Sequence, residues 1–98
     1  MCEFDCVGKA VLIYNEGGMV EQTVEFQNCK FNASAPADGK AAIEIDSYGT
    51  SYKVIIDQET AENVTGFDNG SVSQNPIWNV KNNVYPVTVT VAGEVVYN

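Results

Sequence analysis

The amino-acid sequence predicts an all-β fold: a single small antiparallel β-sandwich or partly open β-barrel of about six or seven short strands. Clusters of Gly, Asn, Asp, Ser and Pro recur at short intervals, and the segments between them are rich in Val, Ile, Thr, Tyr and Phe. Several of these segments alternate apolar and polar residues, as strands with one buried face do. Such spacing is typical of sandwiches and barrels. A chain of 98 residues suffices for one core, so we expect residues 1–98 to form one β domain.

Seven strands are expected between the turn clusters, at about 6–14, 19–28, 40–47, 51–57, 77–81, 84–92 and 94–97. The first two are predicted to pair as an antiparallel hairpin closed by a loop at 15–18. In that register Val7, Val11 and Ile13 share one mostly apolar face. One short helix is expected around 58–64, where QETAENV carries no long apolar stripe.

The alternation also predicts which residues form the core. Three strands should point these residues inward: Ala41, Ile43 and Ile45; Tyr52, Val54 and Ile56; Val87, Val89 and Val91. The single tryptophan, Trp78, is predicted to anchor the core. The functional alternative makes it the anchor of a protein interface.

Composition excludes much catalytic chemistry, because the chain contains neither His nor Arg. General acid–base catalysis and nucleophile activation rely heavily on imidazole, and bidentate binding of phosphate or carboxylate relies on guanidinium. Carboxylate pairs remain, but the alternation places them on solvent faces rather than across a cleft. We therefore expect no enzyme activity, no catalytic residues and no cofactor.

The three cysteines leave at least one thiol unpaired within a monomer. This odd count favours reduced thiols, and with them a cytoplasmic location, or an intermolecular link. The alternative is a bond from Cys2 or Cys6 to Cys29. A zinc site would need a fourth ligand such as Asp5 or Glu3, and no calcium-loop motif is present. No metal site is therefore expected.

Charge narrows the class of partner. The formal net charge is −8, which opposes direct binding to nucleic acid or to an anionic membrane. No apolar run approaches the roughly 18 residues of a membrane span. A basic protein would be attracted, whereas the alternative is that the charge only keeps the domain soluble.

The leading functional hypothesis is a non-catalytic binding protein that docks an acidic sheet face on a basic surface. Glu21, Glu25, Glu44 and Asp46 are expected on solvent faces of strands and would form that face, with Trp78 as anchor. Such a protein would suit an inhibitor that competes with nucleic acid for a basic site, as phage or mobile-element antagonists do.

The alternative hypothesis is a structural subunit of a virion or an extracellular assembly. The last strand, at 94–97, is short and apolar, so it fits a sheet edge that pairs with another chain. Homotypic contacts through this C-terminal strand would give a homo-oligomer.

Overall fold

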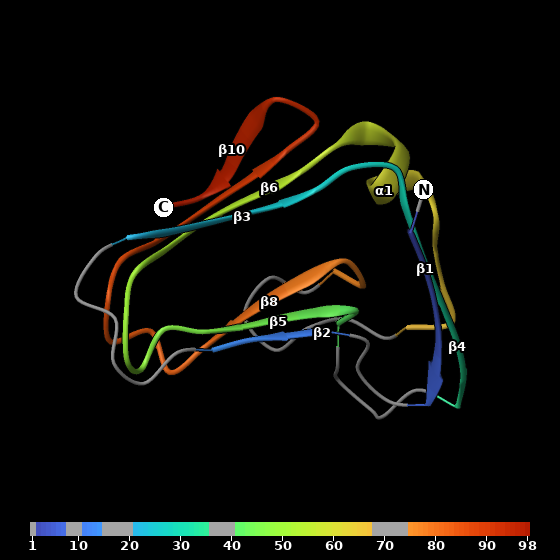
Figure 1. Ribbon diagram of the computed structural model, residues 1–98, viewed down its shortest axis with the longest axis horizontal. Helices are drawn as coiled ribbons and strands as arrows, with labels where there is room; N and C mark the ends of the chain where they lie inside the picture. Colours follow the sequence, from blue (N-terminus) through green and yellow to red (C-terminus); the bar gives the residue numbers. More distant parts are fainter. Residues whose placement is uncertain (1, 8–10, 15–20, 36–40, 68–74) are drawn as a thin grey trace.

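A computed structural model describes residues 2–7, 11–14, 21–35, 41–67 and 75–98, which form three successive coils and a final strand (Figure 1). The first coil contains β1 (Cys2–Val7), β2 (Val11–Ile13) and β3 (Gln22–Phe26). The second contains β4 (Cys29–Ala35), β5 (Ile43–Asp46) and β6 (Tyr52–Ile56). Helix α1 (Gln58–Glu62) leads to the third coil, with β7 (Val64–Thr65), β8 (Trp78–Lys81) and β9 (Val87–Val91), and β10 (Glu94–Tyr97) follows.

Strands that occupy the same place in successive coils pair with one another. The sheets have the orders β1-β4-β7, β2-β5-β8 and β10-β9-β6-β3, and they form three sides of the molecule (Figure 1). Every pairing between coils is parallel, and only β9 with β10 is antiparallel. The described residues therefore build a three-sided parallel β-solenoid, in which each coil stacks on the one before it.

The predicted all-β class is confirmed, but the antiparallel sandwich or barrel is corrected. The predicted first hairpin is wrong, because β3 pairs with β6 and not with an earlier strand; the loop at 15–18 lies outside the described residues. One expected strand, 6–14, corresponds to parts of β1 and β2, and strand β4 was expected to be largely turn. The two-residue alternation shows which side of a strand each residue faces. It does not show which strand pairs with that strand or in which direction the partner runs.

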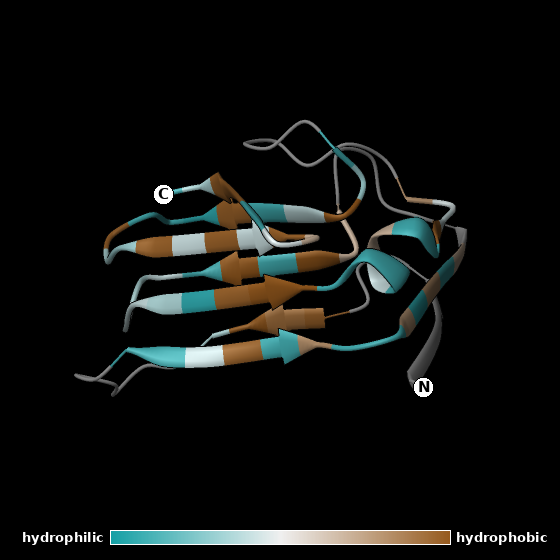
Figure 2. Cartoon of the chain, turned by 90° about the horizontal axis from the view of Figure 1, so that it is seen from above, coloured by the Kyte–Doolittle hydropathy of each residue, from teal (hydrophilic) through white to brown (hydrophobic). Residues whose placement is uncertain are grey.

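The interior is filled by the inward residues of all three sheets. Figure 2 shows the alternation as bands of contrasting hydropathy along the strands. Val54 and Val89 are fully buried neighbours in one ladder with the half-buried Val24. The predicted core is confirmed, with only Val91 half-buried among its nine residues: Ala41, Ile43, Ile45, Tyr52, Val54, Ile56, Val87, Val89 and Val91.

One corner of the solenoid, between the third sheet and the next coil, is held by hydrogen bonds across two coils. Asp57 caps α1 by accepting from the Thr60 N–H at 2.9 Å, and its other oxygen accepts from the Asn28 N–H at 2.7 Å. Thr60 Oγ1 accepts from the Cys29 N–H at 2.9 Å. Asn28 itself has a φ of 50°, a conformation that asparagine tolerates better than most residues. The helix is thus fixed above the turn of the first coil.

The C-terminal end of the core is sealed by the β9–β10 hairpin. Its two turn residues, Ala92 and Gly93, have φ of 51° and 82°, as a type I′ turn requires. The hairpin returns β10 along β9 and brings the Tyr97 ring against Trp78. The strand therefore covers the last coil.

Candidate functional site

The four carboxylates expected to form one acidic face do not share a surface. Glu21 and Glu25 are exposed, but Glu44 is fully buried and Asp46 is 9% exposed. Glu44 and Asp46 lie on the side of β5 opposite Ile43, as the alternation predicts. That side is covered, so their predicted exposure is wrong. Alternation distinguishes the two sides of a strand without showing what lies over each of them.

Asp46 has a structural role at the turns that follow β5 and β8. One carboxylate oxygen accepts from the Tyr48 N–H at 3.0 Å, and the other accepts from Asn82 Nδ2 at 3.2 Å. Ser47 Oγ donates to the Asn82 carbonyl at 3.2 Å. These bonds tie two consecutive coils together, so Asp46 is not available as a docking group.

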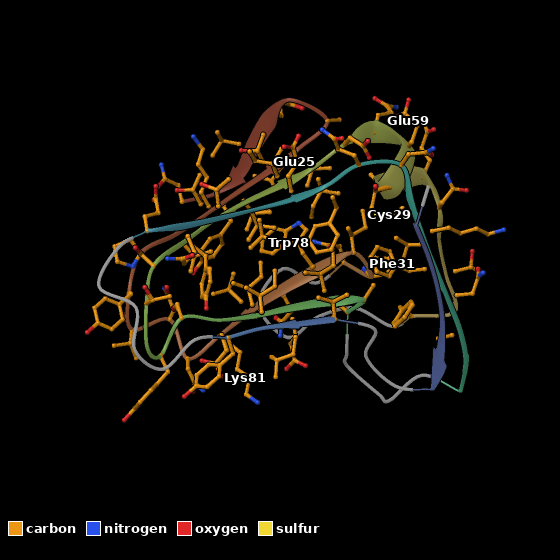
Figure 3. All side chains as sticks on the ribbon, in the orientation of Figure 1. Glu25, Cys29, Phe31, Glu59, Trp78 and Lys81 are labelled. Atoms are coloured by element: carbon orange, nitrogen blue, oxygen red, sulfur yellow. The ribbon has the colours of Figure 1, made fainter. Side chains whose placement is uncertain are left out.

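Trp78 occupies the core, as the first of its two interpretations predicts. Its side chain is 6% exposed and points into the interior (Figure 3). The Tyr97 ring covers it edge to face, with ring centroids 5.5 Å apart. An aromatic anchor for a partner would need a free face, so the geometry does not favour the interface role.

Carboxylates gather instead where the third sheet ends. Because β3, β6 and β9 are parallel, their C-terminal ends lie together at one end of the sheet. Figure 3 shows Glu25 and Glu59 on the same side of the molecule. We name this group the acidic corner; its five members are near the end of β3, after β6, in α1 and at the start of β10: Glu25, Asp57, Glu59, Glu62 and Glu94.

Neutral amides orient part of the acidic corner. Gln27 Nε2 donates to Glu25 Oε2 at 2.9 Å, and Gln58 Nε2 donates to Glu62 Oε2 at 2.8 Å. Hydrogen bonds from Thr60, and then from the Asn28 N–H, hold the pKa of Asp57 below its ordinary value. Amide donors fix the position of a carboxylate without cancelling its charge. The corner therefore presents a negative surface at neutral pH.

Sequence reasoning selected only Glu25 from this corner. Asp57, Glu59 and Glu62 were visible as acids after a strand, but nothing in the sequence aligned that segment with Glu94. The missing information is the stacking of coils, which joins segments far apart in the chain. A usable signal is that Glu25 and Asp57 lie at or directly after the end of a strand.

Strand β10 forms the edge of its sheet, as predicted for the C-terminal segment. Val95 and Val96 on this strand are 60% and 47% exposed. An edge strand leaves one row of backbone donors and acceptors unpaired within its sheet. The exposed valines add apolar area beside that row.

Exposed tyrosines lie at another corner, at the turns after β2, β5 and β8. Tyr14, Tyr48 and Tyr85 are 41%, 62% and 42% exposed. The Tyr85 N–H donates to the Ser47 carbonyl at 3.1 Å, which ties two of these turns together. Tyr48 and Tyr85 are therefore suitable positions for exposed control substitutions.

Cys29 is disulfide-bonded, so the expectation of reduced thiols is wrong for this residue. Its Cα partner in the parallel register of β1 and β4 is Cys2. The odd cysteine count favoured reduced thiols, whereas the alternative of a bond from Cys2 or Cys6 to Cys29 is compatible with a disulfide at Cys29.

The described ranges contain no cluster of three or more Cys, Asp or Glu residues arranged to hold a metal ion. The same ranges include no helix with the length and apolar character needed to cross a membrane. Comparison with protein-family models, with curated proteins and with solved structures found no match to this chain.

Proposed function

We propose that the protein is a non-catalytic structural subunit of an extracellular assembly, joined to a second copy through the edge of β10. The observation that carries the proposal is the combination of an edge strand and two exposed valines on it. Two β10 edges that meet antiparallel about a two-fold axis would continue the sheet from one copy into the next.

The surroundings of β10 suit this role. The type I′ turn at Ala92 and Gly93 fixes the strand on β9, so little ordering is needed when it pairs. The disulfide at Cys29 favours an oxidising compartment, where structural disulfides persist. The absence of His and Arg from the sequence leaves few groups for catalysis.

Analytical ultracentrifugation at micromolar concentrations tests the proposal. The wild type should show a mass above the 10.6 kDa of one chain. Val95→Lys should be monomeric, because a charge on an edge strand opposes pairing. Val84→Lys is the matched control, since Val84 is equally exposed at 60% but lies in a turn, and it should behave as wild type. A monomeric wild type, or equal masses for both variants, would rule out β10 pairing.

A second candidate function is binding of a basic protein surface through the acidic corner. This candidate retains the predicted acidic inhibitor, but its binding surface is the acidic corner, which contains Glu25 and Glu59, and not a sheet face. The supporting observation is that five carboxylates from four segments of chain lie toward one end of the third sheet, two of them oriented by amides. Complementary charge would accelerate association with a basic partner.

This candidate is tested with a Lys- and Arg-rich peptide as probe. Replacing Glu25, Glu59, Glu62 and Glu94 with Gln should preserve the fold, because exposed charges contribute little to stability. Binding should weaken with salt in the wild type and be lost in the fourfold variant. Glu21→Gln, which changes an exposed acid outside the corner, should bind as wild type. Salt-independent binding that survives the fourfold change would contradict this candidate.

A further inference from the structure

The two ends of the solenoid differ in how well the core is covered. Five inward ladders of the second and third sheets cross all three coils, and in four of them the first-coil residue is the most exposed. In the fifth ladder Phe26 of the first coil is 8% exposed, whereas Val91 of the third coil is half-buried. Val24 is half-buried, whereas its ladder neighbours Val54 and Val89 are fully buried. Gln22 is exposed, whereas Tyr52 and Val87 are 2% and 3% exposed.

The ladder of the second sheet shows the same difference. Val11 is half-buried, whereas Ile43 is fully buried and Trp78 is 6% exposed. On the other side of these strands Leu12 is 50% exposed, although its neighbours in the ladder, Glu44 and Asn79, are 0% and 3% exposed. Among the described residues the core is therefore covered less well on the side of the first coil, apart from the ladder that ends at the half-buried Val91.

The third coil keeps four inward residues buried beneath a capping element: Trp78, Val80, Val87 and Val89. Strand β10 occupies the outer edge of β9, and the Tyr97 ring packs on Trp78. No corresponding cap covers the first coil among the described residues. There β1, β2 and β3 are each the end strand of their sheet, and they offer three edges in one layer. A solenoid ordinarily requires a cap or another repeat at such an end.

We infer that the first coil is a docking surface for the terminal coil of another parallel β-solenoid, whose three strands continue the ladders of β1, β2 and β3. This inference is independent of the β10 contact proposed above. It rests on continuity with an interface already present, since all six pairings between coils in the described chain are parallel. The same geometry applied once more would bury Val11, Leu12 and Val24.

A second copy of this chain does not fit the open end in the same way. Its C-terminal end is closed to parallel stacking, because β10 already occupies the edge of β9. Its own first coil, turned to face this one, would present antiparallel strands. The partner chemistry is therefore a three-stranded coil that runs in the same direction, with apolar residues at its inward positions.

The test extends the full chain by one coil. The added coil is a copy of residues 29–56 in which serine replaces the copied cysteine. A copy of residues 27–28 follows it and links it to the chain at Cys2. If the first coil accepts a parallel coil, the slowest-exchanging β3 amides should exchange at least tenfold more slowly than in wild type. A matched control extension carries aspartate at the copied Val54 and Ile56, which prevents packing, and should give no protection.

Four results would overturn the inference. The first is that both extensions slow the exchange of the β3 amides equally. The second is that the extension leaves the exchange of the β3 amides unchanged while the β6 amides exchange as in wild type. Loss of protection in β6 counts against it as well, because a docked coil cannot loosen the coil beneath it. Concentration-dependent protection of β3 in the unextended chain would instead identify a second copy as the occupant. These readouts are taken on β3 and β6, whereas β10 pairing is scored by mass and by the exchange of β10 itself.

Discussion

The rings of Trp78 and Tyr97 meet edge to face, with centroids 5.5 Å apart and an angle of 67° between their planes. Trp78 belongs to β8 in the second sheet, whereas Tyr97 ends β10 on the third, so this contact joins two sides of the solenoid. It explains how the last coil stays buried without another coil above it.

Loss of this contact should weaken the whole domain. Tyr97→Ala is expected to lower the free energy of unfolding by about 2 kcal/mol, through lost ring packing and exposure of Trp78. Denaturant unfolding measures the effect. Tyr85→Ala removes a ring that is 42% exposed and should cost less than about 0.5 kcal/mol. Equal losses in the two variants would show that Tyr97 does not cap the core.

Acid should weaken the corner held by Asp57. Its pKa is lowered by hydrogen bonds from Thr60 and Asn28, so its contribution is present above the unfolded value of about 3.9 and is lost as pH falls through the folded value. Asp57→Asn lacks this contribution. The difference in unfolding free energy between wild type and Asp57→Asn should therefore decrease as the pH is lowered from 6 to the lowest pH at which the protein still folds. A difference independent of pH would contradict the assignment.

The Tyr52 hydroxyl is buried, and no hydrogen-bond partner for it is found in the described part of the chain. Tyr52→Phe removes this polar group and should raise the free energy of unfolding by about 1 kcal/mol. Burial, and then the charge of Asp46, raise the pKa of Tyr52. The folded state therefore retains the proton at higher pH than the unfolded state, and stability should fall as pH rises above about 10.

The control for this prediction is Tyr48→Phe, which changes a ring that is 62% exposed. Urea unfolding at pH 8 and above pH 10 should show a smaller alkaline loss in Tyr52→Phe than in wild type, and no such gain in Tyr48→Phe. If Tyr52→Phe lost as much stability at alkaline pH as wild type, burial of the Tyr52 hydroxyl would not be the cause of that loss.

Val89 tests the inward face of β9. Its side chain is fully buried, so Val89→Asp should unfold the domain because an uncompensated charge cannot be accommodated there. The adjacent Thr90 lies on the other side of the strand and is half-buried. Thr90→Asp should leave a cooperative thermal transition, as circular dichroism would record. Similar unfolding by both variants would mean that the two sides are not distinguished.

The fold was predictable to the level of strands and their faces. Val89 lies between two threonines and Val54 between Lys53 and Ile55, and the two-residue period of each strand places both valines inside. Their adjacency in space was not predictable, because unequal lengths of chain separate the three members of their ladder and no sequence repeat marks the coils. The same gap hid the parallel pairing of Cys2 with Cys29.

The candidate site was less predictable than the core. Glu44 alternates with isoleucines as an exposed residue would, yet it is fully buried. The alternation within β5 does not show that other parts of the chain cover the outer side of this strand. Glu25 and Glu94 lie toward the same end of the third sheet only because β3, β6 and β9 run in parallel. The exposure of Val95 could be expected, because the sequence indicated that the C-terminal strand lies at the edge of a sheet.

Amide hydrogen exchange in β10, recorded at low and high micromolar protein, tests the central claim most directly. If β10 joins two copies, its amides should become more protected as concentration rises, while those of β6, which pairs on both sides within one chain, should not change. Protection of β10 that stays the same across the concentration range would contradict assembly through this edge.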